Sequence, residues 1–163
     1  MEKIKLIFLD IDGVLNYLNC KAKVGSYLGI EDKKLSFVKK IVDSTNAKIV
    51  ITSAWKENWF QDKKDKDKQD DLANYLDMKF AKFNLEIFGT TYGDDPFNKG
   101  LTIKQYIKLI KAFSYKVKSF VIIDDETFDF KKEGLKPYLV KTDFNTGGLN
   151  ENHVKKAIEI LNK

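Results

Sequence analysis

Two pairs of acidic residues stand at the ends of apolar runs in this sequence. Asp10 and Asp12 follow the run "IKLIFL". Asp124 and Asp125 follow the run "SFVII". Burying a carboxylate at the end of a core strand is costly unless another group offsets its charge. Each pair is therefore either part of a turn or part of a site that faces a cation and a substrate.

Hydroxyl and ammonium groups occur at comparable places. Thr52 and Ser53 follow the apolar run "KIVI", and Lys99 precedes an amphipathic segment at 100–113. Ligands of open α/β sheets bind outside the carboxyl ends of the parallel strands, so these groups and the four acids are expected to meet at one edge. Carboxylates that lie so close repel one another and resist ionisation. A hard divalent cation with oxygen ligands, such as Mg²⁺, resolves that conflict.

A nucleophilic carboxylate beside a metal ion, with hydroxyl and ammonium groups around it, suits phosphoryl transfer. In such a site Asp10 attacks phosphorus. Asp12 protonates the leaving oxygen and then activates water against the aspartyl-phosphate formed on Asp10. Gly13 fits the sharp exit that the chain needs just after the acids. We assign Gly13 and Ser53 to substrate binding.

The elements that must position these residues follow from the apolar periodicity. Strands are expected at 4–10, 48–52, 85–92, 119–124 and 137–142. Helices are expected at 31–45, 72–80 and 100–113, in a segment opening at 53–60, and from Glu151, with Asn150 as N-cap. The charged run 61–71 is expected to be solvated, and Asp94 and Asp95, before Pro96, are expected to form a turn.

Strands that alternate with amphipathic helices predict an α/β fold. We expect a Rossmann-like, doubly wound, mainly parallel five-stranded sheet with helices on both faces. The chain has no Pro/Gly-rich linker, so residues 1–163 are expected to form a single domain, with 13–31 as a loop or flap over the site. Trp55 and Trp59 are interpreted as core residues or as the wall of a pocket.

Composition narrows the function further. The net charge of +5 comes from lysine alone, because the chain has no Arg. Lysines spread along the chain indicate a solvated surface rather than a dedicated nucleic-acid groove. One Cys and one His, His153, exclude a disulfide framework and a multi-cysteine zinc site. Because no apolar run could cross a bilayer and no signal peptide is recognisable, a cytoplasmic protein without a membrane partner is expected.

Three motifs resemble those of the haloacid dehalogenase-like (HAD) phosphohydrolase superfamily. "FLDIDGVLN" resembles its DxDGxLx signature, "IVITS" its second motif and "FVIIDDE" its fourth. Together with "ITSAWK", "NKGLTIKQYI" and "VKTDFNTGGLNENHVKKAIEIL", these stretches resemble the small HAD domains of Swiss army knife RNA repair proteins. The resemblance spans nearly the whole chain and implies a HAD-like fold without a large cap domain.

The resemblance also implies roles for the acids. Asp10 would be the phosphorylated nucleophile and a metal ligand. Asp12 would be the general acid/base and would ligate the metal through its backbone carbonyl. Asp125 would bind Mg²⁺ directly, with Asp124 nearby or acting through water.

Two further roles leave alternatives open. Thr52 would donate a hydrogen bond to the phosphoryl group, but Ser53 could take that place because "ITS" allows either register. Lys99 would stabilise the phosphoryl group and the Asp10 carboxylate, although Lys104 lies in the same segment.

The expected activity is a Mg²⁺-dependent phosphatase acting on a phosphorylated substrate. Dehalogenase activity is disfavoured, because Asp12 provides the second acid that the superfamily's dehalogenases lack. Without a large cap, the site resembles those of members that act on large substrates such as nucleic-acid ends. The alternatives are a small-molecule phosphatase, for example for nucleotides, and a non-catalytic HAD-like module that binds phosphate or nucleic acid. The sequence carries no signal for the oligomeric state.

Overall fold

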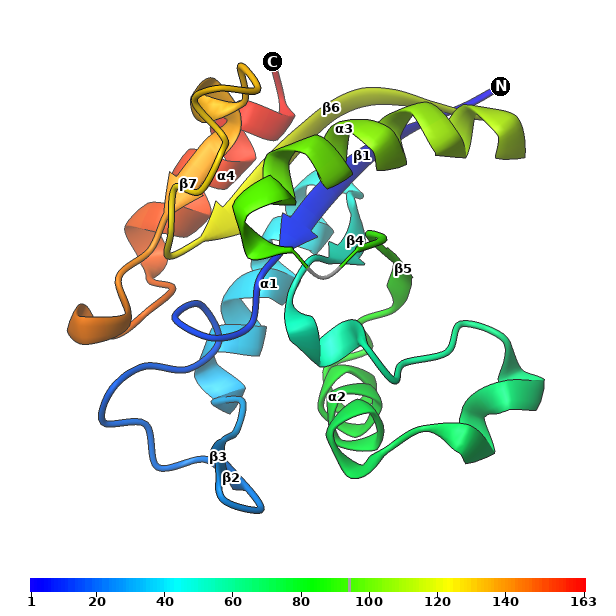
Figure 1. Ribbon diagram of the computed structural model, residues 1–163. Coiled ribbons are helices and arrows are strands. Elements are labelled where there is room, and N and C mark those ends of the chain that lie inside the picture. Colours follow the sequence, from blue (N-terminus) through cyan, green and yellow to red (C-terminus); the bar gives the residue numbers. More distant parts are fainter. Residues whose placement is uncertain (94) are drawn as a thin grey trace.

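Five parallel strands form the central sheet of the computed structural model, which describes residues 1–93 and 95–163 (Figure 1). Their order across the sheet is β5-β4-β1-β6-β7. The strands are β1 (Glu2–Leu9), β4 (Lys48–Ile51), β5 (Ile87–Thr90), β6 (Tyr115–Asp124) and β7 (Leu139–Lys141). All four strand pairs are parallel, which confirms the predicted sheet.

The register of the sheet aligns the ends of its strands. Leu9 lies opposite Ile51 of β4 and Ile123 of β6, and Ile51 lies opposite Thr90 of β5. Three backbone hydrogen bonds carry the pairing one residue further, from Asp10 N to Ile123 O, from Thr52 N to Leu9 O and from Thr91 N to Ile51 O, at 3.0, 3.0 and 3.1 Å. Residues that follow the strands therefore stand in one row at the carboxyl edge.

Helices cover both faces of the sheet (Figure 1). On one face, α1 (Asp32–Thr45), α2 (Asp71–Lys82) and α4 (Glu151–Leu161) share a core with the odd-numbered side chains of β1, such as Ile7. On the other face, α3 (Lys99–Leu109) packs on the even-numbered ones, such as Phe8. Because side chains alternate along a strand, Asp10 points to the same face as Phe8, which is the face that α3 covers.

Two segments differ from the expected elements. Residues 53–60 contain only a 3-10 turn, Ala54–Lys56, instead of the start of a helix. The indole of Trp59 instead donates to Asp77 of α2 at 2.8 Å, a tertiary contact that overrides local helical periodicity. The first strand of the carboxyl half, β6, begins at Tyr115 rather than at 119, because its lysine-rich first residues pair with Glu2–Ile4 of β1.

The segment 13–31 forms a small hairpin of β2 (Lys23–Val24) and β3 (Tyr27–Leu28). The turn expected around Asp94 falls partly outside the described residues. Its neighbour Asp95 accepts a hydrogen bond from Phe97 N at 2.9 Å and caps a short 3-10 turn. None of the helices in the described part of the chain has the length and apolar character needed to cross a membrane.

The start of α4 provides a test of the fold. Asn150 Oδ1 accepts from His153 N, and His153 Nδ1 accepts from Asn150 N, both at 3.1 Å. Asn150→Ala should therefore lower the free energy of unfolding by about 1 kcal/mol in urea titrations. Asn152→Ala, in the exposed first turn of the same helix, is the matched control and should cause no loss. Equal stabilities for the two variants would contradict the predicted cap.

Candidate active site

Lys99 joins the ends of two strands at the centre of the site. Its Nζ lies 2.6 Å from Asp124 Oδ2 and 3.2 Å from Asp10 Oδ1. The Asp124 side chain is fully buried, and its other oxygen accepts from Glu126 N at 3.0 Å. Burial opposes the charge on Lys99, but attraction to Asp10 and Asp124 outweighs it and raises the Lys99 pKa. The ammonium is therefore held firmly in its charged form.

Asp10, Asp124 and Asp125 form a cluster in which one carboxylate oxygen from each lies within 4.8 Å of the others. Burial, followed by the charge of Asp124, raises the pKa of Asp10 to about 7. Burial and then the charge of Asp10 raise the pKa of Asp125. Lys99 supplies one positive charge against three carboxylates. The oxygen-rich donor set and its excess negative charge fit a hard divalent cation such as Mg²⁺.

Asp12 lies outside that cluster and is exposed. Its Oδ1 accepts from Asn16 Nδ2 at 2.8 Å, and its Oδ2 accepts from the indole Nε1 of Trp55 at 3.2 Å. These bonds fix the direction of a carboxylate that remains accessible from solvent. The role of Trp55 is more specific than a core residue or a pocket wall, and only the folded chain brings it to Asp12.

Asn16 is a positioning residue that the sequence interpretation did not include. It is fully buried, and its Oδ1 accepts from Gly13 N at 2.9 Å. Its amide nitrogen also donates to Gly29 O at 3.1 Å, next to the hairpin. The turn after Asp10 is thus tied to Asp12 and to the hairpin by one side chain. The position of Asn16, four residues after Asp12, is the only local signal in the sequence for this role.

The two candidate hydroxyl groups are in different states. The Thr52 hydroxyl is buried and has no hydrogen-bond partner among the described residues. The Ser53 hydroxyl accepts from Trp55 N at 3.3 Å and caps the turn at Ala54–Lys56. Thr52 also stands beside Asp10 in the row of strand ends. Its hydroxyl is therefore free to meet a ligand, whereas that of Ser53 has a structural partner.

The two candidate lysines are also far from equivalent. Lys99 lies in the acidic cluster, whereas Lys104 forms a surface ion pair with Glu133 at 3.2 Å. Two neighbours that sequence reasoning missed position Lys99. The Asp129 carboxylate accepts from the backbone N of Gly100 and Leu101, at 2.6 and 3.0 Å, and so fixes the first turn of α3.

Phe128 is the second of these neighbours. The Lys99 Nζ lies 5.1 Å from the centre of the Phe128 ring, within the range of a cation–π interaction. Phe128 has a φ of +38°, which is rare for a bulky side chain. Such strained conformations concentrate at functional sites, where the surrounding structure imposes them.

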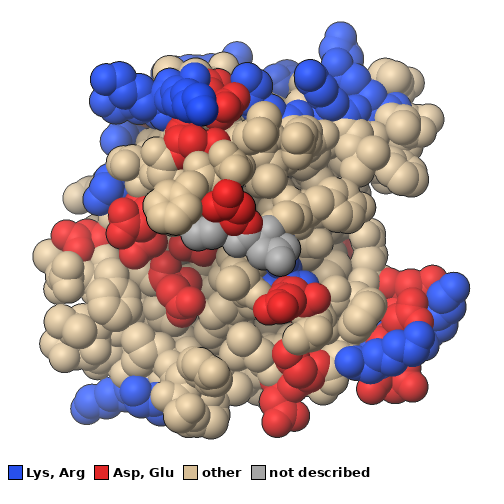
Figure 2. All heavy atoms as spheres, viewed as in Figure 1, with Lys and Arg blue, Asp and Glu red and all other residues tan. Residues whose placement is uncertain are grey.

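The surface around the site is acidic on the face shown in Figure 2. Asp and Glu side chains gather around its centre, while most of the lysines lie along its margins. The lysine excess of the chain is thus not concentrated at the mouth of the site.

The parallel sheet carries acids at the carboxyl ends of its central strands. Residues 6–154 match the family model for the HAD domain in Swiss Army Knife RNA repair proteins, and the chain belongs to that family. This confirms the resemblance found in the motifs. Membership of this HAD family implies a phosphohydrolase-type function. A comparison with curated proteins finds no match.

Two solved structures are similar in fold. One is a chain in the structure of a Pnkp1/Rnl/Hen1 complex, with 14% identity and a TM-score of 0.46 over 90% of this chain and 47% of that chain. The protein thus spans about half the length of its match there. The other is described as a "putative HAD superfamily (subfamily III A) hydrolase from Legionella pneumophila", with 14% identity and a TM-score of 0.46 over 97% of this chain and 81% of that chain.

Gly13 allows a test of the acidic cluster. Its φ is +78°, and a Cβ there would overlap the Asp125 carboxylate. Gly134 has a φ of +73° with open space around it, so Gly134→Ala is a matched control. The left-handed backbone should make each substitution cost about 1–2 kcal/mol in unfolding, and the overlap with Asp125 should make Gly13→Ala the costlier of the two. Only Gly13→Ala should also weaken Mg²⁺ or Mn²⁺ binding, by roughly 10-fold or more in calorimetric titrations, because it displaces Asp125. Equal cation affinities would contradict this arrangement.

Proposed function

We propose that this chain is a Mg²⁺-dependent phosphomonoesterase that works through an aspartyl-phosphate on Asp10. One observation carries the proposal. Asp10 lies in a buried cluster with a cationic Lys99, two further carboxylates and, in the adjacent strand-end position, an unpartnered Thr52 hydroxyl. The residues that would serve as nucleophile, as metal ligands and as donors to the phosphoryl oxygens thus lie together at the carboxyl edge of one sheet.

Asp10 and Asp125, with Asp124 beside them, would hold the metal ion. When bound, Mg²⁺ would neutralise the carboxylates and the charge of the phosphoryl group. Lys99 and the Thr52 hydroxyl donate hydrogen bonds to the phosphoryl oxygens. These donors are fixed before the reaction, which is the condition for electrostatic stabilisation of a transition state.

The reaction has two steps. An Asp10 oxygen attacks phosphorus, the bond to the leaving oxygen breaks, and Asp12 gives its proton to that oxygen. Water then attacks the phosphorus of the aspartyl-phosphate, and Asp12 takes a proton from the water. The bond between phosphorus and Asp10 breaks, which releases inorganic phosphate and restores the Asp10 carboxylate. Asn16 and Trp55 direct Asp12 in both steps.

We propose a phosphorylated nucleic-acid end as the substrate. Only residues 91–98 separate β5 from α3, so no large cap stands there, and the segment 13–31 offers a short hairpin as a flap. A bulky substrate can approach such a site. The family's description as a domain of RNA repair proteins supports the same choice. The alternatives are a phosphatase for small molecules such as nucleotides and a non-catalytic phosphate-binding module.

Turnover assays test the reaction. Purified protein should hydrolyse p-nitrophenyl phosphate in Mg²⁺, lose activity in EDTA and regain it when Mg²⁺ is restored. Asp10→Asn should lower kcat by on the order of 10³-fold or more, because the nucleophile is lost. Asp43→Asn, an exposed acid paired with Lys39, is the matched control and should retain full activity.

A panel of 5′- and 3′-phosphorylated oligonucleotides, mononucleotides, sugar phosphates and phosphopeptides then addresses the substrate. The open site predicts the highest kcat/KM for an oligonucleotide end. A clear preference for a sugar phosphate would overturn that choice. No metal-dependent turnover on any phosphoester would sink the phosphatase proposal and favour the non-catalytic module.

The choice between the two hydroxyl groups has a test of its own. Thr52→Val keeps the side-chain shape and should lower kcat roughly 10- to 100-fold, because one hydrogen bond to a charged group is lost. Its melting temperature should not fall, since the hydroxyl is unpartnered in the free protein. Ser53→Ala should instead lose about 1 kcal/mol of stability with the cap and keep most of its kcat. The opposite pattern would place Ser53 at the phosphoryl group.

A further inference from the structure

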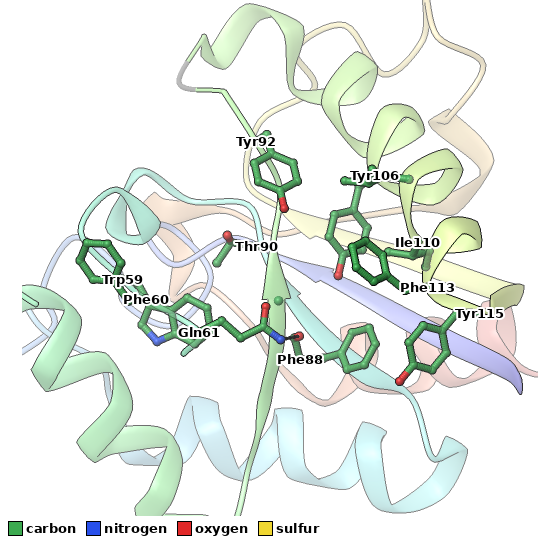
Figure 3. A pocket seen from close by; sticks show the side chains of 12 residues that line it. Trp59, Phe60, Gln61, Phe88, Thr90, Tyr92, Tyr106, Ile110, Phe113 and Tyr115 are labelled. Carbon is green, nitrogen blue, oxygen red and sulfur yellow. Dashed lines mark hydrogen bonds between the residues drawn. The ribbon is translucent and has the colours of Figure 1, made fainter. Parts of the chain in front are cut away.

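A cavity of about 380 Å³ lies beside β5, one of the two edge strands of the sheet. Three segments line it, namely residues 59–61, β5 with the residues that follow it as far as Tyr92, and the chain from α3 to the start of β6. Figure 3 shows side chains from all three segments around the strand. Its volume is in the usual range of small-ligand sites.

The lining is rich in aromatic rings, and none of the described residues that form it carries a charged side chain. Tyr92 and Phe113 are each 66% exposed, and both line this cavity, so they contribute to one exposed apolar surface of the kind that marks ligand-binding sites. Polar atoms are also present, because Tyr106 and Tyr115 contribute phenols and Gln61 contributes an amide that donates to Phe88 O at 3.1 Å. A planar, uncharged group that stacks and forms hydrogen bonds fits this lining better than an anion does.

Gly89 keeps one wall of this cavity in place. A Cβ at this position would lie 2.6 Å from the Tyr106 hydroxyl, so a larger residue would push the phenol away from the strand. Burial raises the pKa of Tyr106 to about 12. The phenol therefore stays protonated and keeps its capacity to donate a hydrogen bond.

The cavity adjoins the row of strand ends that contains Asp10. Thr90 and Tyr92 line it, and Thr91 between them follows β5 in the same row as Thr52 and Asp10. With about 4.8 Å between neighbouring strands, Thr91 stands roughly 10 Å from Asp10. The Thr91 hydroxyl is buried and has no partner among the described residues, as is true of Thr52. The unpartnered hydroxyl groups of Thr52 and Thr91 thus belong to residues that stand between Asp10 and the part of β5 that lines the cavity.

We propose that the cavity beside β5 is a nucleobase subsite for the substrate whose phosphate lies at Asp10. The inference rests on the proposed phosphatase function and assigns a binding place to the base of its substrate. Bases stack on aromatic side chains without regard to sequence, because every base has a π face. The base belongs either to a mononucleotide or to an oligonucleotide end. A phosphoprotein that inserts an aromatic side chain is the competing occupant.

Two exposed rings provide variants that should fold normally. Tyr92→Ala and Phe113→Ala are compared with Met78→Ala, which is 58% exposed on α2 and lies outside the cavity. The substrates are a phosphorylated oligonucleotide end, the same end with an abasic terminal residue, the corresponding mononucleotide, ribose 5-phosphate and a phosphotyrosine peptide.

We expect the wild type to prefer the intact oligonucleotide end to the abasic one, and the mononucleotide to ribose 5-phosphate. Each ring variant should lower kcat/KM for base-containing substrates by about 5- to 100-fold, the range of one stacking contact, and leave the base-free substrates unchanged. Met78→Ala should change neither. The oligonucleotide end and the mononucleotide are then compared, and the one whose kcat/KM falls more on Tyr92→Ala is the substrate whose base occupies the cavity.

Equal kcat/KM for base-containing and base-free substrates, with turnover intact, would overturn the subsite and leave the phosphatase standing. A ring-dependent preference for the phosphotyrosine peptide would overturn it in favour of a protein substrate. Binding of adenosine and uridine to Asp10→Asn, followed through the fluorescence of Trp59 beside the cavity, separates the two proposals. Nucleoside binding lost on Tyr92→Ala would support the subsite even without turnover, and no binding in addition to no turnover would overturn it.

Discussion

The constraint on which this structure depends is a cluster of three carboxylates at the edge of a sheet, of which Asp10 and Asp124 are buried and Asp125 is half-buried. Lys99 balances one of their charges, so the ionised cluster keeps a net negative charge that a phosphate dianion would not approach. A divalent cation at Asp10, Asp124 and Asp125 would bring the sum to zero. Cation binding is therefore expected to precede phosphate binding. A bound cation would relieve the free-energy cost of bringing these acids together, and this relief would contribute to metal affinity.

Much of the surrounding structure serves to hold these charges in fixed directions. Asp129 fixes the first turn of α3, and the Phe128 ring lies against Lys99. On the other side of the site, Asn16 fixes the turn that leads to Asp12. Strand ends joined by backbone bonds are stiffer than loops, and groups held in this way need little reorganisation during a reaction. The rigid part of the site is therefore the part that handles charge.

The sequence predicts the sheet and the acids because both are written in local patterns. An apolar run such as "LIFL" indicates a covered strand, and in a parallel sheet Asp10 at its end stands at the carboxyl edge. The hydrogen bonds of Asp12 with Trp55, and of Trp59 with Asp77, join residues distant in the chain, so periodicity could not reveal them or the missing helix at 53–60. The aromatic cavity was hidden for the same reason, since its rings come from three separate segments.

The acidic face and the uncharged cavity together indicate how such a site would distinguish one phosphoester from another. Because most lysines on this face lie at its margin, an oligonucleotide end would be held at its terminal phosphate rather than along its backbone. Stacking on the rings beside β5 gives affinity without charge. Only a group attached at a fixed distance from the reacting phosphate can make this contact. Metal and Lys99 would thus select for a phosphate, and the rings beside β5 would select for what is attached to it.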